Sequence, residues 1–336
     1  MRVAMFGAGR IGQLHGRLLV AQPEVSELVI SDPDMERARV AAKATGASVA
    51  PSVDEAFDGA EAVVVAASTD AHARLVRQAV DRGIPVFCEK PLASDLDQTI
   101  ELVDHIEARS VPVQVGFQRR FDPAIAEARR LLESGELGTL YLVRLIAHDH
   151  EPPPDDYIPT SGGLFRDSSI HDFDALRWVT GRSVEEVYAA GSVRGFPVFA
   201  RSDDVDTAAV ILRLDDGTLG VLSQTRHDPR GYDVRMEFVG SRDSVAIGLT
   251  PQTPLRTIDS GLVGSEPGWD SFLTRFETAY RAELLAFLRV ARGEIPSPCT
   301  ARDALEAMRI SVAATRSRAE HRPVSLSEVG QPAHAG

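Results

Sequence analysis

The sequence predicts an α/β protein, with an N-terminal doubly wound parallel sheet followed by an α+β domain whose sheet is mainly antiparallel and open-faced. Two patterns support this prediction. Up to about residue 115, short apolar runs alternate with helical stretches; after residue 140, strand-like runs follow one another with turn signals between them. Alternation is typical of a parallel sheet and direct succession of an antiparallel one. A chain of 336 residues exceeds a typical domain of about 150, so we expect two domains, 1–119 and 120–336.

The composition excludes several function classes. The formal net charge of −13 would repel nucleic-acid phosphates and anionic lipid, so neither is an expected partner. Two cysteines are too few for a disulfide framework or a zinc site, which fits a reducing cytoplasm. The longest apolar run, Ala62 to Ala67, is far shorter than the roughly 20 residues of a membrane span. The chain opens directly into a strand, without a signal-peptide pattern. We therefore predict a cytoplasmic protein.

The glycine-rich stretch near the N-terminus is the first candidate site. Val3 to Phe6 reads as a strand and runs into Gly7-Ala8-Gly9-Arg10-Ile11-Gly12, after which a helical pattern continues to Leu19. The G-x-G-x-x-G spacing between a strand and a helix is typical of a dinucleotide-binding Rossmann fold, because the glycines let the backbone approach a pyrophosphate. Free N–H groups at the helix N-terminus then bind the phosphates. The sequence predicts cofactor contacts at residues 7 and 9–12.

The residue that selects between NAD and NADP is Asp32. The apolar run Leu28 to Ile30 ends at Ser31-Asp32, twenty residues beyond Gly12. A carboxylate at this point accepts hydrogen bonds from the ribose hydroxyls and repels a 2′-phosphate, which favours NAD. The alternative is that Asp32 caps the helix predicted over Met35 to Thr45.

The alternation continues to residue 115. We predict strands over Ala62–Ala67, Ile84–Cys88 and Val111–Val115, and helices over Ala71–Arg82 and Leu96–Arg109. Ser68, Thr69 and His72 follow the first of these strands and are candidate cofactor contacts, since ligands of such sheets bind beyond the carboxyl ends of the strands. Helix capping by Ser68, Thr69 or Asp70 is the alternative.

Glu89-Lys90-Pro91 places a lysine at the end of a buried strand. An ammonium group is almost never fully buried without a partner, so Lys90 should reach the same sheet edge as the glycine-rich stretch. The alternative is a solvated lysine beside a glutamate, with a proline ending the strand.

The second half is predicted to be rich in strands. A helix over Pro123–Ser134 ends at Gly135, and Asp215-Asp216-Gly217 is a hairpin signal. The predicted strands are Tyr141–His148, Val187–Val193, Thr207–Leu214, Leu219–Gln224, Tyr232–Val239 and Ser244–Leu249. Two amphipathic helices, Phe276–Arg292 and Ala301–Arg318, follow late in the chain.

A third candidate site lies on a helix predicted over Asp167 to Val179 and closed by Gly181. Asp167 and His171 are four residues apart, so they share one helix face and can reach one substrate group. A structural histidine whose partner is the aspartate is the alternative. The preceding Ser161-Gly162-Gly163 permits a close backbone approach.

His148-Asp149-His150-Glu151 raises the question of a metal. The two histidines would share one strand face, but without a clear further ligand we predict no metal site. The run Pro152 to Tyr157 reads as a stiff loop, which either contributes to specificity or only connects.

Together these motifs resemble the Gfo/Idh/MocA oxidoreductase family, and within it the myo-inositol dehydrogenases. The resemblance covers nearly the whole chain. It rests on the glycine loop, Glu89-Lys90-Pro91, Gly116-Phe117-Gln118-Arg119-Arg120-Phe121-Asp122, Ser161-Gly162-Gly163, the Asp167 and His171 pair, and Gly231-Tyr232-Asp233. Two departures leave the polyol open: Gln118 stands where Met is more usual, and the charged run Arg226 to Arg230 precedes Gly231.

The resemblance implies site residues in three groups. Lys90, Asp167 and His171 would be catalytic; Glu89 would contact the ribose on the nicotinamide side, with Gln118 also at the cofactor. Substrate contacts would come from Lys90, His171, Asp155, Ser168, Tyr232 and Tyr280. The resemblance also implies a homo-oligomer, a tetramer or a dimer.

The chemistry expected is hydride transfer between NAD and a secondary hydroxyl of a cyclitol or sugar. His171 would act as general base, since an imidazole titrates near neutral pH. Lys90 would stabilise the developing alkoxide, and Asp167 would orient the charged groups. The competing hypotheses are a sugar ketoreductase, an NAD-dependent glycosidase, and a regulator that binds a dinucleotide and sugar without catalysis.

Overall fold

The computed structural model describes residues 1–258 and 263–330 and divides the chain into two compact units. The first unit comprises Met1–Gln118 and Thr278–Glu306; the second comprises Arg119–Glu277 and the chain from Ala307 onward. This differs from the predicted division at 119/120, because a late segment packs in the first unit. There the backbone N–H of Val115 donates to the Cys299 carbonyl at 2.9 Å, and the rings of Phe87 and Phe287 lie 5.8 Å apart.

The first unit contains the predicted parallel sheet. Its strand order is β3-β2-β1-β4-β5-β6, and every neighbouring pair is parallel, which confirms the doubly wound prediction. The strands are β1 (Arg2–Phe6), β2 (Glu27–Ser31), β3 (Ser48–Val49), β4 (Ala62–Val65), β5 (Val86–Glu89) and β6 (Val113–Gly116). The two-residue β3 was not predicted, because so short a strand leaves no periodic pattern.

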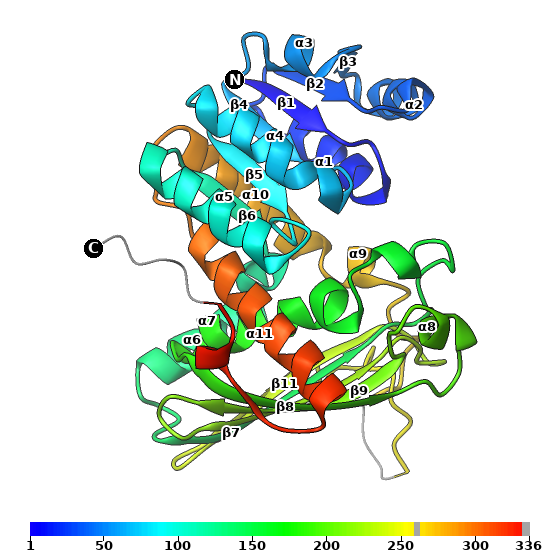
Figure 1. The fold of residues 1–336 in the computed structure, drawn as a ribbon, viewed down its shortest axis with the longest axis vertical. Coiled ribbons are helices and arrows are strands. Elements are labelled where there is room, and N and C mark those ends of the chain that lie inside the picture. The colour runs from blue at the N-terminus through cyan, green and yellow to red at the C-terminus, as the bar shows by residue number, and fades with distance from the viewer. Residues whose placement is uncertain (259–262, 331–336) are drawn as a thin grey trace. The chain divides into compact units, whose positions relative to one another are not determined.

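Helices surround this sheet in Figure 1. They are α1 (Arg10–Val20), α2 (Met35–Thr45), α3 (Val53–Phe57), α4 (Thr69–Asp81), α5 (Leu96–Arg109), α10 (Glu277–Ala291) and the start of α11 (Ala301–Glu320). Each long helix buries one face; in α4 that face includes Leu75, Val76 and Ala79. The spacing of these residues buries a single apolar stripe against the sheet.

The second unit contains a seven-stranded sheet of order β12-β11-β7-β10-β9-β8-β13. Its strands are β7 (Leu140–His148), β8 (Val184–Ser192), β9 (Thr207–Leu214), β10 (Leu219–Thr225), β11 (Asp233–Gly240), β12 (Ser244–Ile247) and β13 (Val324–Ser325). Only β7 and β10 pair in parallel, so the sheet is mainly antiparallel as predicted. The β9–β10 hairpin turns at Gly217, whose φ is +88°. That positive φ is the reason the turn favours glycine.

One face of this sheet carries helices and the other does not. Figure 1 shows α6 (Pro123–Glu133), α7 (Ile170–Thr180) and α11 over one face, while no helix of the described residues covers the opposite face. The short helices α8 (Pro197–Arg201) and α9 (Phe272–Arg275) complete the unit. On the uncovered face Tyr188 and Val221 are the register partners of Ile211, which is 48% exposed. The sheet is therefore open-faced, with exposed apolar side chains at its centre.

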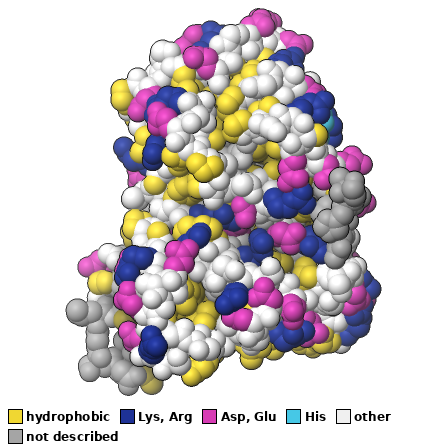
Figure 2. Space-filling view, turned by 90° about the vertical axis from the view of Figure 1, so that its left-hand side faces the viewer, with side chains coloured by type: hydrophobic (Ala, Val, Ile, Leu, Met, Phe, Trp, Pro, Cys, Tyr) yellow, Lys and Arg dark blue, Asp and Glu magenta, His cyan; other side chains and the backbone are white. Residues whose placement is uncertain are grey.

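The surface carries mixed charge. In Figure 2 the Lys and Arg side chains lie among Asp and Glu side chains, without a broad patch of one sign on the face shown. Among residues 1–258 and 263–330, no helix has the length and apolar content that crossing a bilayer requires.

Candidate functional site

The glycine loop between β1 and α1 has the geometry that a pyrophosphate requires. Gly7 has φ +100°, and a Cβ there would lie 2.3 Å from the Ala66 carbonyl oxygen. A Cβ on Gly12 would lie 2.2 Å from the Gly7 carbonyl oxygen, so this glycine lets α1 pack closely on the loop. A Cβ on Gly9 would meet nothing within 4 Å. The loop is thus tight at its two ends and open at its middle glycine, which fits a dinucleotide phosphate.

Asp32 lies directly after β2, next to this loop. Its carboxylate accepts hydrogen bonds from the backbone N–H groups of Ala8 and Asp34, each at 2.8 Å. The alternative that Asp32 caps α2 is wrong, because Asp34 is the cap and accepts from the N–H groups of Glu36 and Arg37. Asp32 therefore links the strand end to the glycine loop, where a carboxylate that binds the ribose hydroxyls is expected.

The other predicted cofactor residues of the first unit have different surroundings. Arg10 begins α1 and is exposed, and Ile11 follows it. Ser68 stands at the N-cap of α4, just before Thr69, but makes no side-chain capping bond. The residue His72 is 1% exposed, and its ring nitrogens lie 2.8 Å from the Pro91 carbonyl oxygen and 3.1 Å from that of Ala67. Burial lowers the pKa of His72.

His72 thus lies against the chain beside Lys90, with Nδ1 at 2.8 Å from the Pro91 carbonyl oxygen. This is at odds with its predicted polar contact to the cofactor, which stays a prediction.

Lys90 follows β5, and the residue before it is anchored by a histidine that sequence reasoning missed. His15 Nε2 lies 2.6 Å from Glu89 Oε1, and both residues are buried. The backbone N–H of Lys90 donates to Glu89 Oε2 at 3.3 Å, while Lys90 itself is partly exposed. His15 lies among the buried residues of α1, so its helical pattern resembles that of a core residue. The available signal was its spacing of three residues from Gly12, which places both residues on one face of α1.

Gln118 opens η1 (Gln118–Phe121) and is 2% exposed. Its Oε1 atom is buried, with no hydrogen-bond partner within the described part of the chain. A buried acceptor without a partner fits a residue that meets a ligand amide.

In the second unit, Asp167 lies in a five-residue π-helix, η3 (Phe165–Ser169), that precedes α7. The prediction of one α-helix from Asp167 was wrong, because apolar spacing does not distinguish the wider π turn from an α turn. The first turn is fixed by the N–H groups of Arg166 and Asp167, which both donate to the Gly163 carbonyl. Such π segments are frequent at functional sites.

Asp167 is held by two donors from other elements. Arg226 Nη2 donates to Asp167 Oδ2 at 2.7 Å, and the Tyr157 hydroxyl donates to Asp167 Oδ1 at 2.9 Å. Arg226 also donates to Asp149 Oδ2 at 3.1 Å, and its side chain is only 5% exposed. Burial lowers the pKa of Arg226, but Asp167 and Asp149 more than offset this and raise it. The charged run before Gly231 therefore contributes a cation to the carboxylate predicted to be catalytic.

The helix that carries His171 is fixed by two buried arginines of the Gln118–Phe121 segment. Arg119 pairs with Asp172, and Arg120 donates to both carboxylate oxygens of Asp174. Burial lowers the pKa of Arg119, but Asp172 and Tyr232 more than offset this. His171, beside these anchored residues, is partly exposed in the first turn of α7.

Two predicted substrate residues have contrasting environments. Ser168 accepts a hydrogen bond from Gln224 Nε2 at 2.5 Å, and the Oε1 atom of Gln224 accepts one from Ser169. Gln224, which was not predicted, thus ties the π-helix to β10. Asp155 is exposed in the turn before η2 (Ile158–Thr160).

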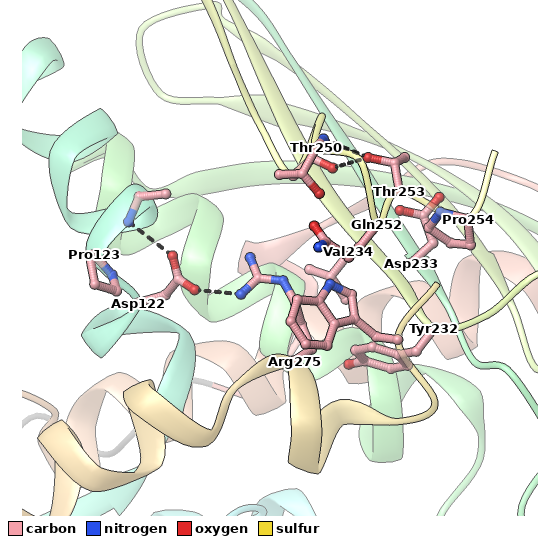
Figure 3. A pocket seen from close by; sticks show the side chains of 13 residues that line it. Asp122, Pro123, Tyr232, Asp233, Val234, Thr250, Gln252, Thr253, Pro254 and Arg275 are labelled. Carbon is pink, nitrogen blue, oxygen red and sulfur yellow. Dashed lines mark hydrogen bonds and ion pairs between the residues drawn. The ribbon is translucent and has the colours of Figure 1, made fainter. Parts of the chain in front are cut away.

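Tyr232 lines a cavity of about 300 Å³ in the second unit. Figure 3 shows Asp122 and Arg275 pointing toward each other in this cavity, 2.8 Å apart. Burial raises the pKa of the Tyr232 phenol, although Arg119 acts in the opposite direction.

Tyr280 lies in the first unit on α10, 4% exposed, with its ring centroid 5.8 Å from that of His15. The substrate contacts of Tyr232 and Tyr280 stay predictions.

One group of potential metal ligands occurs in the described residues. His148, Asp228 and Asp233 each offer an atom within 4.8 Å of the others. Asp233 already accepts hydrogen bonds from Arg235 at 2.9 and 3.0 Å, so its charge is offset by a guanidinium. His150, the other histidine of this stretch, bonds the Asp228 carbonyl at 3.0 Å. We infer no metal site from this group.

Comparison with known proteins agrees with the geometry of both units. A family described as "Oxidoreductase family, NAD-binding Rossmann fold" matches residues 1–117, and "GFO/IDH/MocA C-terminal domain" matches residues 125–246. The chain belongs to the Gfo/Idh/MocA oxidoreductase family. The glycine loop and Asp32 thus lie in its NAD-binding domain.

Three members of the Gfo/Idh/MocA family show how far the similarity extends. A myo-inositol dehydrogenase, Hyg17, of Streptomyces leeuwenhoekii is 43% identical over 321 residues, covering 94% of this chain and 97% of the relative. The crystal structure of a myo-inositol dehydrogenase from Corynebacterium glutamicum is 36% identical with a TM-score of 0.88, covering 97% and 98% of the two chains. A scyllo-inositol dehydrogenase from Lactobacillus casei, solved with NAD(H) and scyllo-inositol, is 26% identical with a TM-score of 0.87, covering 97% and 99%.

Proposed function

We propose that this protein is an NAD-dependent dehydrogenase that transfers a hydride between a secondary hydroxyl of a myo-inositol-like cyclitol and the nicotinamide. The observation that carries the proposal is 43% identity to a myo-inositol dehydrogenase over nearly the whole of both chains. The glycine loop, with its open position at Gly9, supports the cofactor assignment. A sugar ketoreductase, an NAD-dependent glycosidase or a non-catalytic regulator is not favoured by these relatives.

The proposed catalytic groups are Lys90, Asp167 and His171. In this proposal the three groups act on one substrate hydroxyl, and His171 takes the proton of that hydroxyl. NAD, when bound, would supply the acceptor for the hydride that leaves the carbon carrying the hydroxyl. Lys90, as an ammonium, stabilises the negative charge that develops on oxygen. Asp167 orients the pair, and its own position is fixed by Arg226 and Tyr157.

The charge around Asp167 supports a neutral substrate. Arg226 belongs to the charged run in which the sequence departs from the inositol enzymes, and its guanidinium forms ion pairs with Asp149 and Asp167. It therefore adds no unmatched positive charge that would favour an anionic sugar acid. A polyol, recognised through hydroxyl groups, agrees better with this balance.

We also propose a cytoplasmic homo-oligomer, most simply a tetramer. Apolar side chains at the centre of the open sheet face, Tyr188, Ile211 and Val221 among them, support a second copy as the partner. Such exposed apolar surface on a folded protein usually marks an interface. Cys88 and Cys299 are both buried free thiols, which supports a reducing compartment.

The test is to incubate the full chain with NAD and a panel of inositols and sugars, and to follow the absorbance of reduced nicotinamide. We expect NAD-dependent oxidation of at least one inositol, with turnover strongly reduced in Lys90→Ala and His171→Ala. Near wild-type turnover in either variant would contradict the catalytic assignment. Release of a free sugar from a glycoside, without net formation of NADH, would instead indicate a glycosidase.

A further inference from the structure

Lys90 lies between two residues that buried histidines hold in place. On one side His15 Nε2 lies 2.6 Å from Glu89 Oε1. On the other side His72 Nδ1 lies 2.8 Å from the Pro91 carbonyl oxygen. The histidines come from different helices, α1 and α4. The position of Lys90 is therefore fixed by contacts on both of its chain neighbours.

The Glu89 carboxylate links His15 to Lys90. One of its oxygens faces His15, and the other accepts the backbone N–H of Lys90 at 3.3 Å. A Cβ on Gly116 would lie 2.9 Å from that second oxygen and 3.1 Å from the Phe87 ring. The carboxylate is thus confined from three sides, and its rotation would break the hydrogen bond from the backbone N–H of Lys90.

The surroundings of His15 indicate which proton the pair shares. The His15 side chain is fully buried, with the Phe87 and Tyr280 rings packed edge-on at centroid distances of 5.3 and 5.8 Å. Within the described part of the chain, Nδ1 has no hydrogen-bond partner. A proton on Nδ1 would be buried without an acceptor, which is costly. The neutral tautomer that donates from Nε2 to a charged Glu89 fits this environment, and a bond to a charged acceptor is a strong one.

We propose that His15 is a positioning residue for catalysis: its bond to Glu89 fixes the carboxylate, and through it the backbone and side-chain direction of Lys90. The proposal rests on the proposed function of Lys90. In this proposal α1 has two roles: its N-terminus contacts the cofactor phosphates, and its residue His15 positions Lys90. Loss of the bond should lower turnover more than it lowers affinity for NAD.

The chain offers a readout that does not depend on turnover, because Lys43 and Lys90 are its two lysines. Reductive methylation with ¹³C-formaldehyde should give two lysine signals by NMR, distinct from that of the N-terminal amine. Lys43 lies in the last turn of α2 and serves as the internal reference. In His15→Leu we expect the Lys90 signal to shift and the Lys43 signal to stay.

The kinetic test compares His15→Leu with His15→Gln, whose amide can donate to Glu89, at saturating NAD and myo-inositol. Leu should lower kcat by about 10- to 100-fold, the range that a misplacement of about 1 Å can cost. Gln should return kcat toward wild type, with little change in the Kd for NAD. Gly116→Ala, which displaces the carboxylate without removing any charge, should lower kcat in the same direction.

The matched control is His105→Leu, which removes another histidine–carboxylate pair of the first unit, with Asp81 at 2.9 Å. It should leave kcat and the Lys90 signal unchanged.

Wild-type kcat and an unmoved Lys90 signal in folded His15→Leu would overturn the proposal. So would equal loss of kcat and thermal stability in the Leu and Gln variants, which would mean a structural role only. If His15→Leu does not fold, Gly116→Ala decides, and wild-type kcat there overturns the inference. Turnover by Lys90→Ala would instead refute the proposed function, while the NMR shift would still test the link to His15.

Discussion

Replacing Arg226 by methionine would test the network around Asp167. The substitution keeps an unbranched apolar stem but removes the guanidinium that bonds Asp167 at 2.7 Å and Asp149 at 3.1 Å. Two carboxylates would then face each other without their cation. We expect a large loss of stability, together with lower kcat because Asp167 loses the hydrogen bond from Arg226.

The magnitude follows from burial. The Arg226 side chain is 5% exposed, and those of Asp149 and Asp167 are 23% and 12% exposed. Breaking a buried pair costs about 3–5 kcal/mol, and the partial exposure of the carboxylates places the expected loss near 3 kcal/mol. For a folding unit of this size, each kcal/mol corresponds to about 2–4 °C in Tm, so a decrease of about 6–12 °C is expected.

The matched control is Arg213→Met. Arg213 pairs with Glu185 at 2.5 Å, but these side chains are 46% and 45% exposed. An exposed pair contributes at most about 1 kcal/mol. In thermal and urea melts, Arg226→Met should therefore lose clearly more unfolding free energy than Arg213→Met. A loss in Arg226→Met within about 1 kcal/mol of the control would refute the reasoning, because it would mean that water replaces the guanidinium.

Three further predictions concern other sites. Burial raises the pKa of Asp206, but the N–H groups of Gly195 and Arg194 more than offset this and hold the pKa below its usual value. Because the folded pKa is the lower one, Asp206→Asn should cost about 2 kcal/mol at pH 7. That difference from wild type should shrink in urea titrations below about pH 4, where the carboxylate takes up a proton. Asp32→Asn should weaken NAD binding about 10- to 100-fold and reduce the preference for NAD over NADP, as measured by fluorescence titration. An unchanged ratio of the Kd for NADP to the Kd for NAD would contradict the assignment of Asp32 to the ribose. In the proposed homo-oligomer, Ile211→Glu should dissociate the subunits without unfolding them, as measured by sedimentation velocity; an unchanged sedimentation coefficient would argue against the open sheet face as the interface.

Much of the first unit could be predicted because its signals are local. Gly7 has a positive φ, a strand pattern precedes it and a helical pattern follows it, so the Rossmann fold follows from neighbouring residues. Asp32 lies at a fixed distance along the chain from the same loop. The alternative role of Asp32 as the N-cap of α2 was wrong, because the cap is Asp34, the residue directly before Met35.

The contacts that sequence reasoning missed join residues far apart in the chain. His15 and Glu89 are 74 positions apart, and Asp167 and Arg226 are 59 positions apart. Each member looks ordinary alone: His15 like a core residue, and Arg226 like an exposed charge in a loop. The π turn at Asp167 was missed for a different reason, because helical periodicity carries no information about its extra residue.

The return of Thr278–Glu306 to the first unit has a consequence for how the protein is made. During synthesis the glycine loop and all six strands of the parallel sheet leave the ribosome early, but α10 emerges only after strands β7 to β12 of the second sheet. Until then the face of Phe87 that meets Phe287 has no native cover. The first unit therefore cannot complete its fold until residues about 170 positions later have been synthesised. One such contact is the hydrogen bond of 2.9 Å that Gln114 donates to the Glu283 carbonyl. Contacts of such long sequence separation slow folding, and a fragment ending near residue 118 would lack the helix that completes its core.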